Sequence, residues 1–245
     1  MKTQILVTSL VTLLCIACTK KDSDANTHTE KKTLDSQIQK VPNSDDCFKL
    51  ALNKEFSLND HDSTQIRIVP TTFNDKKAIA IEKQTGGIKS ATIYDETGRT
   101  ELADQSYGTQ ELGTDPNTIV SVTHYKAPLP SYPSNLKPNQ KFKITYDTVT
   151  TSTKDREETK SNISMDITFL GFEDLNFIDA SDQKLAFKNV CHFTSSVSAD
   201  SKDKAMVDGT TDIWIAEGFG TIRTVVKTKQ GEILFDDAIG DEPQP

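Results

Sequence analysis

Alternation of apolar and polar residues over long stretches is the feature that most restricts how this chain can fold. In "FKITYD" (142–147), Phe142, Ile144 and Tyr146 alternate with polar residues, and "NISMDITF" (162–169) repeats the pattern. A period of two places the apolar side chains on one face of a β-strand, which is typical of antiparallel sheets with one buried and one wet face. These segments therefore predict strands rather than helices.

The same pattern recurs along most of the chain, with turn residues between its repeats. Further candidate strands lie at residues 65–69, 78–82, 89–94, 119–125, 187–193, 212–216, 221–226 and 232–236. Glycines in "TGG" (85–87), "DETG" (95–98), "EGFG" (217–220) and "KQG" (229–231) supply tight connections. Helical periodicity never exceeds about two turns, and only residues 47–53 offer a short helix. The sequence predicts an all-β antiparallel body of about ten strands, as a curved sheet, half-barrel or sandwich.

A proline-rich passage, "APLPSYPSNLKPNQ" (127–140), divides this predicted body, which we place at residues 47–240. Prolines at this density are incompatible with continuous strand pairing. The passage is therefore either a boundary between two domains or a long connection within one curved sheet. The small size of each half favours the second interpretation.

The N-terminus has the features of an export leader. Lys2 precedes an apolar run from Ile5 to Ala17, which is interrupted only by hydroxyl residues. Thirteen residues at ~1.5 Å each reach about 20 Å, less than the ~30 Å hydrocarbon core of a bilayer. We therefore interpret residues 1–17 as a signal peptide rather than a membrane span.

The end of this leader, Cys15-Ile16-Ala17-Cys18, resembles the lipobox of bacterial lipoprotein precursors. The resemblance implies cleavage after Ala17 and acylation of Cys18, although Cys15 stands where leucine is usual. Because Thr19 follows the cysteine instead of aspartate, the resemblance favours the outer membrane, on its periplasmic or its surface side. A cleaved secretion signal and an uncleaved cytosolic form are the alternatives. A CxxC redox or zinc pair is disfavoured, since no further ligands accompany it.

Residues 18–46 are polar and lack a sustained period, and we expect a disordered tether there. A flexible coil of that length reaches about 30 Å. Residues 241–245 form an acidic tail. If the leader is removed and Cys18 is acylated, only Cys47 and Cys191 remain, and an oxidising compartment favours a disulfide between them. Two buried free thiols are the alternative.

The second half resembles a loosely defined class of secreted proteobacterial β-domains of uncharacterised function. The matching segments are 136–142, Gly171-Phe172-Glu173, Phe187 to Cys191, and "WIAEGFGTI" (214–222). The class often has a "PAG.F" turn where this chain has "DQKLAF". The resemblance implies a curved sheet, distantly similar to periplasmic lipid-carrying half-barrels, with an apolar concavity. Trp214 is either a core residue, which we favour, or a ligand platform.

No catalytic or metal constellation stands out in the sequence. Asp60, His61 and Asp62 could contact a cation, yet a solvated turn explains them better. His192 and Cys191 should face opposite sides of a strand, so they do not form a nucleophile and base pair. We predict no catalytic residue, no metal and no cofactor, and the formal charge of −8 disfavours nucleic acid.

These observations favour a membrane-anchored envelope lipoprotein, attached through a lipid at Cys18, with a non-catalytic binding or structural β-module. Its expected ligand is a lipid or an envelope protein. The alternatives are a periplasmic lipid or ligand carrier of half-barrel form, and an enzyme without a recognisable motif.

Overall fold

One antiparallel sheet of twelve strands forms the body of the computed structural model. The structure describes residues 41–57, 64–109, 113–178, 183–200 and 209–240. Each strand pairs with the next in the chain, in the order β1 to β12. The elements are α1 (Ser44–Cys47), β1 (Lys54–Ser57), β2 (Gln65–Phe73), β3 (Lys76–Thr85), β4 (Ile88–Tyr94), β5 (Glu101–Tyr107), β6 (Ile119–Tyr125), β7 (Gln140–Ser152), β8 (Glu158–Ile178), β9 (Lys184–Asp200), β10 (Gly209–Ala216), β11 (Gly220–Thr228) and β12 (Ile233–Ala238). The predicted all-β class is confirmed.

Ten of these strands coincide with the ten segments that the alternation predicts, and two were missed. β1 has only four residues and a single large apolar side chain, Phe56. β5 carries Asp104 and Ser106 at the positions that face the same side as Glu101. Neither strand therefore shows apolar residues at a period of two, which is the signal on which the prediction depended.

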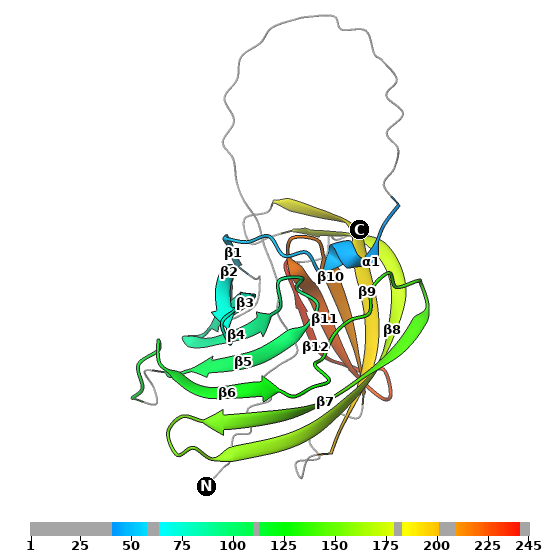
Figure 1. Ribbon diagram of the computed structural model, residues 1–245. Helices are drawn as coiled ribbons and strands as arrows, with labels where there is room; N and C mark the ends of the chain where they lie inside the picture. The colour runs from blue at the N-terminus through cyan, green and yellow to red at the C-terminus, as the bar shows by residue number, and fades with distance from the viewer. Residues whose placement is uncertain (1–40, 58–63, 110–112, 179–182, 201–208, 241–245) are drawn as a thin grey trace, which may run out of the picture.

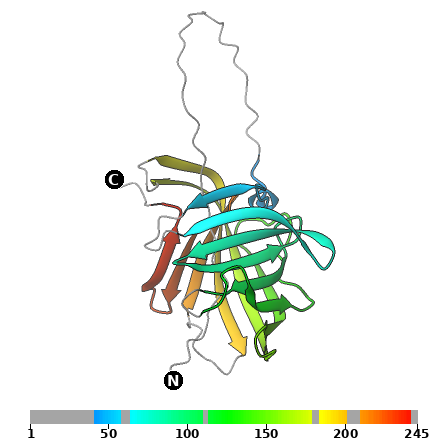
Figure 2. The same ribbon diagram turned by 90° about the vertical axis from the view of Figure 1, so that its left-hand side faces the viewer.

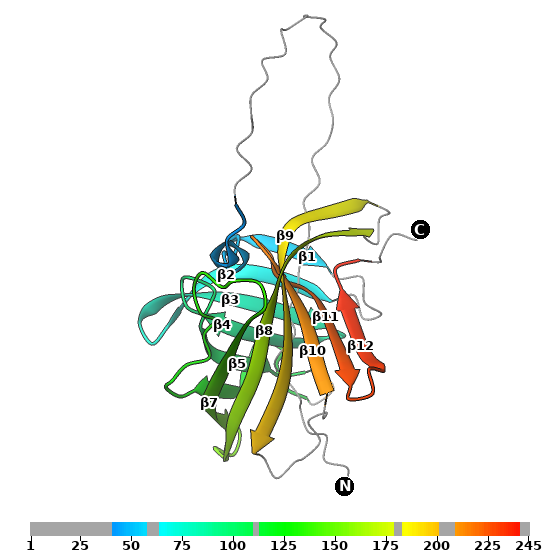
Figure 3. The ribbon, with the colours of Figure 1, turned by 90° about the vertical axis from the view of Figure 1, so that its right-hand side faces the viewer.

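The sheet curls so that its two halves face each other. Strands β2 to β7 lie across one side of the molecule, and β8 to β12 run along the other (Figures 1 and 3). Lys83 Nζ of β3 lies 3.8 Å from the buried Asp237 Oδ2 of β12, across the interior. The sheet is open, since β1 and β12 are its two ends. The fold is thus a half-barrel, with an inner face that carries Ile68, Ile81 and Ile213.

Large apolar side chains fill much of the interior. One cluster joins the β1–β3 end to the β9–β11 region through residues such as Ile66, Ile81 and Ile222. A second cluster lies between β7 and β10, where the tilted rings of Phe169 and Phe193 pack with centroids 5.0 Å apart. Phe169, Phe193, Ile66 and Ile222 are at most 1% exposed. Burial of this kind stabilises the fold by about 1.5–3 kcal/mol for each large side chain.

Two irregularities bend the longest hairpin, β8–β9. The register shifts between Phe169 and Gly171 and again between Glu173 and Leu175. Such bulges increase twist and redirect a strand. The far end of the hairpin therefore folds over the half-barrel (Figures 1 and 2), and its Phe187 ring lies 5.1 Å from Phe219.

The proline-rich passage is a connection within the single sheet. β6 and β7, which flank it, pair directly, with Tyr125 opposite Thr148. The passage leaves the sheet at the cis Ala127-Pro128 bond and returns after placing Leu136 in the second cluster. A ladder that joins both halves of the chain gives no structural boundary at 127–140.

The described part of the chain enters the sheet through α1, a single turn that begins three residues before the predicted body. Asn43 caps it by accepting a hydrogen bond from the Asp45 backbone N–H at 3.0 Å. The expected helix at 47–53 is therefore shorter and lies earlier in the chain. None of the helices in the described ranges has the length and apolarity needed to cross a membrane.

Candidate functional site

The inner face of β4 to β7 carries polar side chains where a half-barrel would usually be apolar. Ser90 lies opposite Ser106, which lies opposite Ser121, which in turn lies opposite Ser152. Residues paired across a ladder point to the same side of the sheet, so these four hydroxyls form one row across four strands. All four side chains are half-buried.

A second polar row runs beside the first, at positions two residues away from it on each strand. It contains Thr92, Asp104, Thr123, Thr150 and Thr159 of β4 to β8. The hydroxyls of Thr123 and Thr150 lie 2.8 Å apart in a hydrogen bond. We call the two rows together the hydroxyl face.

The buried apolar residues of β4 and β5 point the other way. Ala91, Ile93 and Ala103 are buried on the outer face. Val69 and Phe73, from the β2–β3 hairpin, pack against this outer cluster. The usual arrangement, apolar inside and polar outside, is therefore inverted on these two strands, and departures of this kind concentrate at functional sites.

Tyrosines and carboxylates border the hydroxyl face on the side of the second core cluster. Tyr94 donates a hydrogen bond to Glu101 Oε1 at 3.3 Å, and Tyr125 donates one to Asp104 Oδ2. The Tyr125 ring meets Tyr146 edge to face, with centroids 5.3 Å apart. Each of these two acidic side chains is therefore held by a tyrosine hydroxyl.

Desolvation shifts the titration of this cluster. Burial, with a smaller contribution from the nearby Asp104 charge, raises the pKa of Glu101 from 4.5 to about 8, against the opposing effect of the tyrosine hydrogen bonds. Burial is also the main cause that raises the pKa of Tyr94 and Tyr146. Glu101 is consequently protonated in most molecules at neutral pH.

A second group of titratable residues lies on the outer face of β8 to β11, around His192. Its Nδ1 donates to Glu173 Oε1 at 2.7 Å, and its ring stacks on Trp214 with centroids 4.2 Å apart. Trp214 Nε1 also donates to Glu173. On the other side, Asp212 accepts a hydrogen bond from Lys227 Nζ at 2.6 Å.

The side chains of this outer group hold one another in place through hydrogen bonds and ring contacts. Burial lowers the pKa of His192, although Glu173 and Asp212 oppose the shift. Its Nε2 atom is buried, 3.9 Å from Asp212 Oδ1. Trp214 is 8% exposed, with the Arg223 guanidinium 5.2 Å from its ring. The indole therefore packs in the core, as we favoured, and offers no stacking platform.

The outer side of β7 and β8 carries an open pocket of about 510 Å³. Charged and amide side chains line it, including Asp147, Lys160 and Asn162. Asn162 donates to Asp147 across the ladder at 2.7 Å. This pocket is distinct from the hydroxyl face, and its lining is unsuited to an acyl chain.

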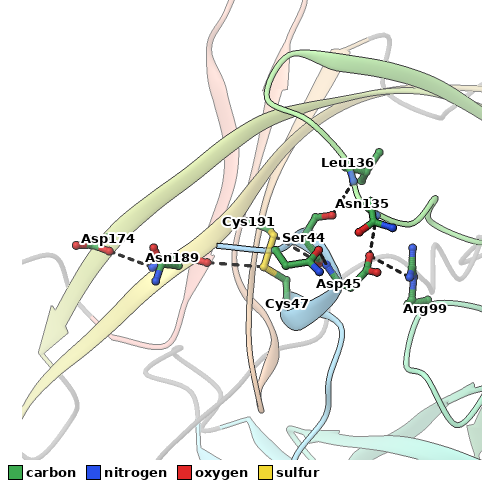
Figure 4. Close-up of a disulfide and its surroundings, with 10 residues drawn as sticks. Ser44, Asp45, Cys47, Arg99, Asn135, Leu136, Asp174, Asn189 and Cys191 are labelled. Atoms are coloured by element: carbon green, nitrogen blue, oxygen red, sulfur yellow. Dashed lines mark hydrogen bonds and ion pairs between the residues drawn. A yellow bond between two sulfur atoms is a disulfide. The ribbon is translucent and has the colours of Figure 1, made fainter. Parts of the chain in front are cut away.

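The disulfide between Cys47 and Cys191 is present, with Cα atoms 6.1 Å apart, and it joins α1 to the middle of the sheet (Figure 4). Asp45, in the same turn, accepts a hydrogen bond from the Asn135 backbone at 2.9 Å and forms an ion pair with Arg99 at 3.0 Å. Ser44 Oγ accepts one from the Leu136 backbone at 2.8 Å. One helical turn thus fastens β9, the proline-rich passage and the β4–β5 turn together.

Comparison with known proteins leaves the family of the chain open. No family model and no curated protein matches it. It is similar to a crystal structure of an exported protein with a YmcC-like fold from Bacteroides fragilis, at 11% identity and a TM-score of 0.47. The match covers 80% of this chain and 99% of that one.

Several predicted features lie outside the described residues. They are Cys18, the leader at 1–17, most of the tether, His61 with its flanking aspartates, and the tail at 241–245. Within the described ranges, histidine, cysteine and acidic side chains form no group of three or more that could hold a metal ion. The apolar concavity that the resemblance implied is not found where the row of Ser90, Ser106, Ser121 and Ser152 lines the inner face.

The sequence contains a signal for the hydroxyl face that our sequence analysis did not use. Pairs of small polar residues with one residue between them recur on four successive strands: Ser90 and Thr92, Asp104 and Ser106, Ser121 and Thr123, Thr150 and Ser152. Such spacing places both members on one face of a strand. The outer network around His192 has no comparable signal, because its residues come from four separate strands.

Proposed function

We propose that the chain is an exported lipoprotein, acylated at Cys18 and held on a bacterial outer membrane, whose β-body serves as a non-catalytic binding module. The observation that carries the proposal is the Cys47–Cys191 disulfide. Disulfides persist in oxidising compartments such as the bacterial periplasm. The disulfide in the body is therefore what we expect of a protein that the leader directs to an oxidising compartment.

The position of α1 supports a role for the segment before it as a tether. The disulfide and the contacts of Asp45 fix the point at which the chain enters the sheet. A body that hangs from a lipid needs such a fixed entry point, because its first strand, β1, has only four residues. Stable attachment itself requires more than one acyl chain, as a lipidated N-terminal cysteine supplies.

Two features support binding rather than lipid carriage or catalysis. Aromatic and aliphatic side chains fill the apolar part of the interior, so an acyl chain would have to displace them. The best candidate for a catalytic base, His192, has a buried Nε2 atom and engages Glu173 through Nδ1. The half-buried hydroxyl face is neither filled by the apolar core nor part of the His192 network, and it is the surface to which we assign ligand binding.

Replacement of Cys18 with serine in the full-length precursor should abolish incorporation of labelled palmitate and release the protein from the membrane fraction. The matched control is Cys15→Ser, which changes the other leader cysteine and should keep both palmitate and membrane attachment. Separation of inner and outer membranes on a density gradient then tests the location, and Thr19→Asp should move the protein to the inner membrane. Palmitate incorporation into Cys18→Ser would refute the anchor.

A further inference from the structure

We infer that the hydroxyl face binds an uncharged carbohydrate chain. This inference deepens the proposed binding function and names the ligand class. It rests on the two polar rows, which cross four to five strands on the inner side of the half-barrel.

The hydrogen-bonding groups of the face match those of a sugar. Each serine or threonine hydroxyl can donate one hydrogen bond and accept two, as sugar hydroxyls do. Asp104 stands in the middle of the second row, where its carboxylate accepts a hydrogen bond from Tyr125. Because neighbouring strands lie about 4.8 Å apart, the rows repeat hydrogen-bonding groups at roughly the spacing of successive rings in an extended glycan.

Charge argues against anionic ligands. The second row contains the Asp104 carboxylate. Lys83 lies opposite Ser90 of the first row, and its Nζ already faces Asp237 at 3.8 Å. Phosphate and sulfate groups would therefore meet a negative charge with little compensation.

Apolar ligands fit no better. The inner positions of β4 to β7 in the two rows hold hydroxyls or a carboxylate, and Ala91, Ile93 and Ala103 lie on the opposite face. A hydrocarbon placed over these hydroxyls would bury them without hydrogen-bond partners, which is unfavourable for each group. The neighbouring tyrosines Tyr125 and Tyr146 are at most 7% exposed, so hydroxyl edges rather than aromatic stacking must supply the contacts.

The test uses the mature lipoprotein, purified from membranes in detergent, on an array of immobilised neutral and anionic oligosaccharides that includes dextran and dextran sulfate fragments. We expect binding to at least one neutral glycan, and titration calorimetry should show that a sulfated form of the same backbone binds at least tenfold more weakly. Absence of binding to every neutral glycan, or tighter binding of the sulfated form, overturns the inference.

A pair of double variants tests whether the rows supply the contacts. Thr123→Val with Thr150→Val removes the hydroxyl pair on the inner face and should weaken binding at least tenfold. The matched control is Thr145→Val with Ser164→Ala, which removes a cross-strand hydroxyl pair of 3.3 Å on the outer face and should leave affinity unchanged. Valine suits a strand, and thermal melting checks that both variants fold. Equal affinity in the two variants overturns the inference.

The outcome is separable from that of the anchor. Glycan binding is measured on purified protein, whereas palmitate incorporation is measured in cells. Binding without acylation would refute the lipoprotein proposal and retain the carbohydrate site. Acylation without glycan binding would refute the carbohydrate site and retain the lipoprotein proposal.

Discussion

Replacement of Cys191 with serine should lower the free energy of unfolding of the body by about 2–5 kcal/mol. The disulfide closes a loop with a sequence separation of 144 residues, and in the chain-entropy model a loop of this size is worth ~5 kcal/mol. For a body of this size the midpoint of thermal unfolding should fall by about 5–15 °C. Differential scanning calorimetry of the oxidised protein and the variant measures the difference.

The control separates the bond from the two side chains. Cys47 and Cys191 are both at most 2% exposed, so serine at either position also buries a hydroxyl. The double variant Cys47→Ser with Cys191→Ser should nevertheless cost little more than either single change, because each already removes the whole bond. Chemical reduction of the native protein should reproduce most of the loss. A reduced protein that melts at the same temperature as the oxidised one would contradict the prediction.

Replacement of Glu101 with glutamine should stabilise the protein at alkaline pH and have little effect in acid. Burial raises the pKa of this carboxyl from 4.5 to about 8, so the folded state binds its proton more tightly than the unfolded state. The contribution of Glu101 to the free energy of unfolding should therefore be greatest below pH 4.5, and it should decline as the pH rises through 8. Glutamine stays neutral throughout, and its amide oxygen can still accept from Tyr94.

The expected gain at pH 9 is on the order of 2 kcal/mol, once the partial exposure of the carboxyl is allowed for. Urea unfolding at pH 5, 7 and 9 measures it as a difference that grows with pH. Glu55→Gln is the matched control, because Glu55 lies on an exposed surface with its side chain 65% accessible. That variant should differ from the native protein by the same small amount at each pH. A pH-independent effect of Glu101→Gln would show that its carboxyl is already ionised.

The sequence predicts the strands of this protein well because most of them bury one face. Ile144, Tyr146, Met165 and Ile167 all occupy inner positions that alternation assigned to the core. Apolar alternation does not predict β5, because Asp104 and Ser106 occupy its inward-facing positions. The strand that alternation failed to predict therefore belongs to the surface that we assign to ligand binding. A polar inner face suits a ligand, and the same polar residues remove the apolar alternation by which a strand is recognised.

A contact between residues far apart in the sequence could be predicted only where the sequence offers few candidate partners. The disulfide could be predicted because the leader cleavage and Cys18 acylation that we propose would leave only two cysteines. The carboxylate cluster could not, because Glu101 and Asp104 are two of many acidic residues and only the fold brings Tyr94 and Tyr125 to them. The bends of β8 depend on register shifts at Phe169 and Glu173, which residue periodicity does not encode.

The attachment of α1 determines how the body would respond to mechanical force applied at its N-terminus. The first strand after α1 is β1, a four-residue edge strand that tension alone would peel away one hydrogen bond at a time. The Cys47–Cys191 bond instead transmits the load to β9, which is held by ladders to β8 and β10 on both sides. Rupture there requires many hydrogen bonds to break together. The half-barrel can therefore be pulled from its N-terminal end without unravelling from its weakest edge.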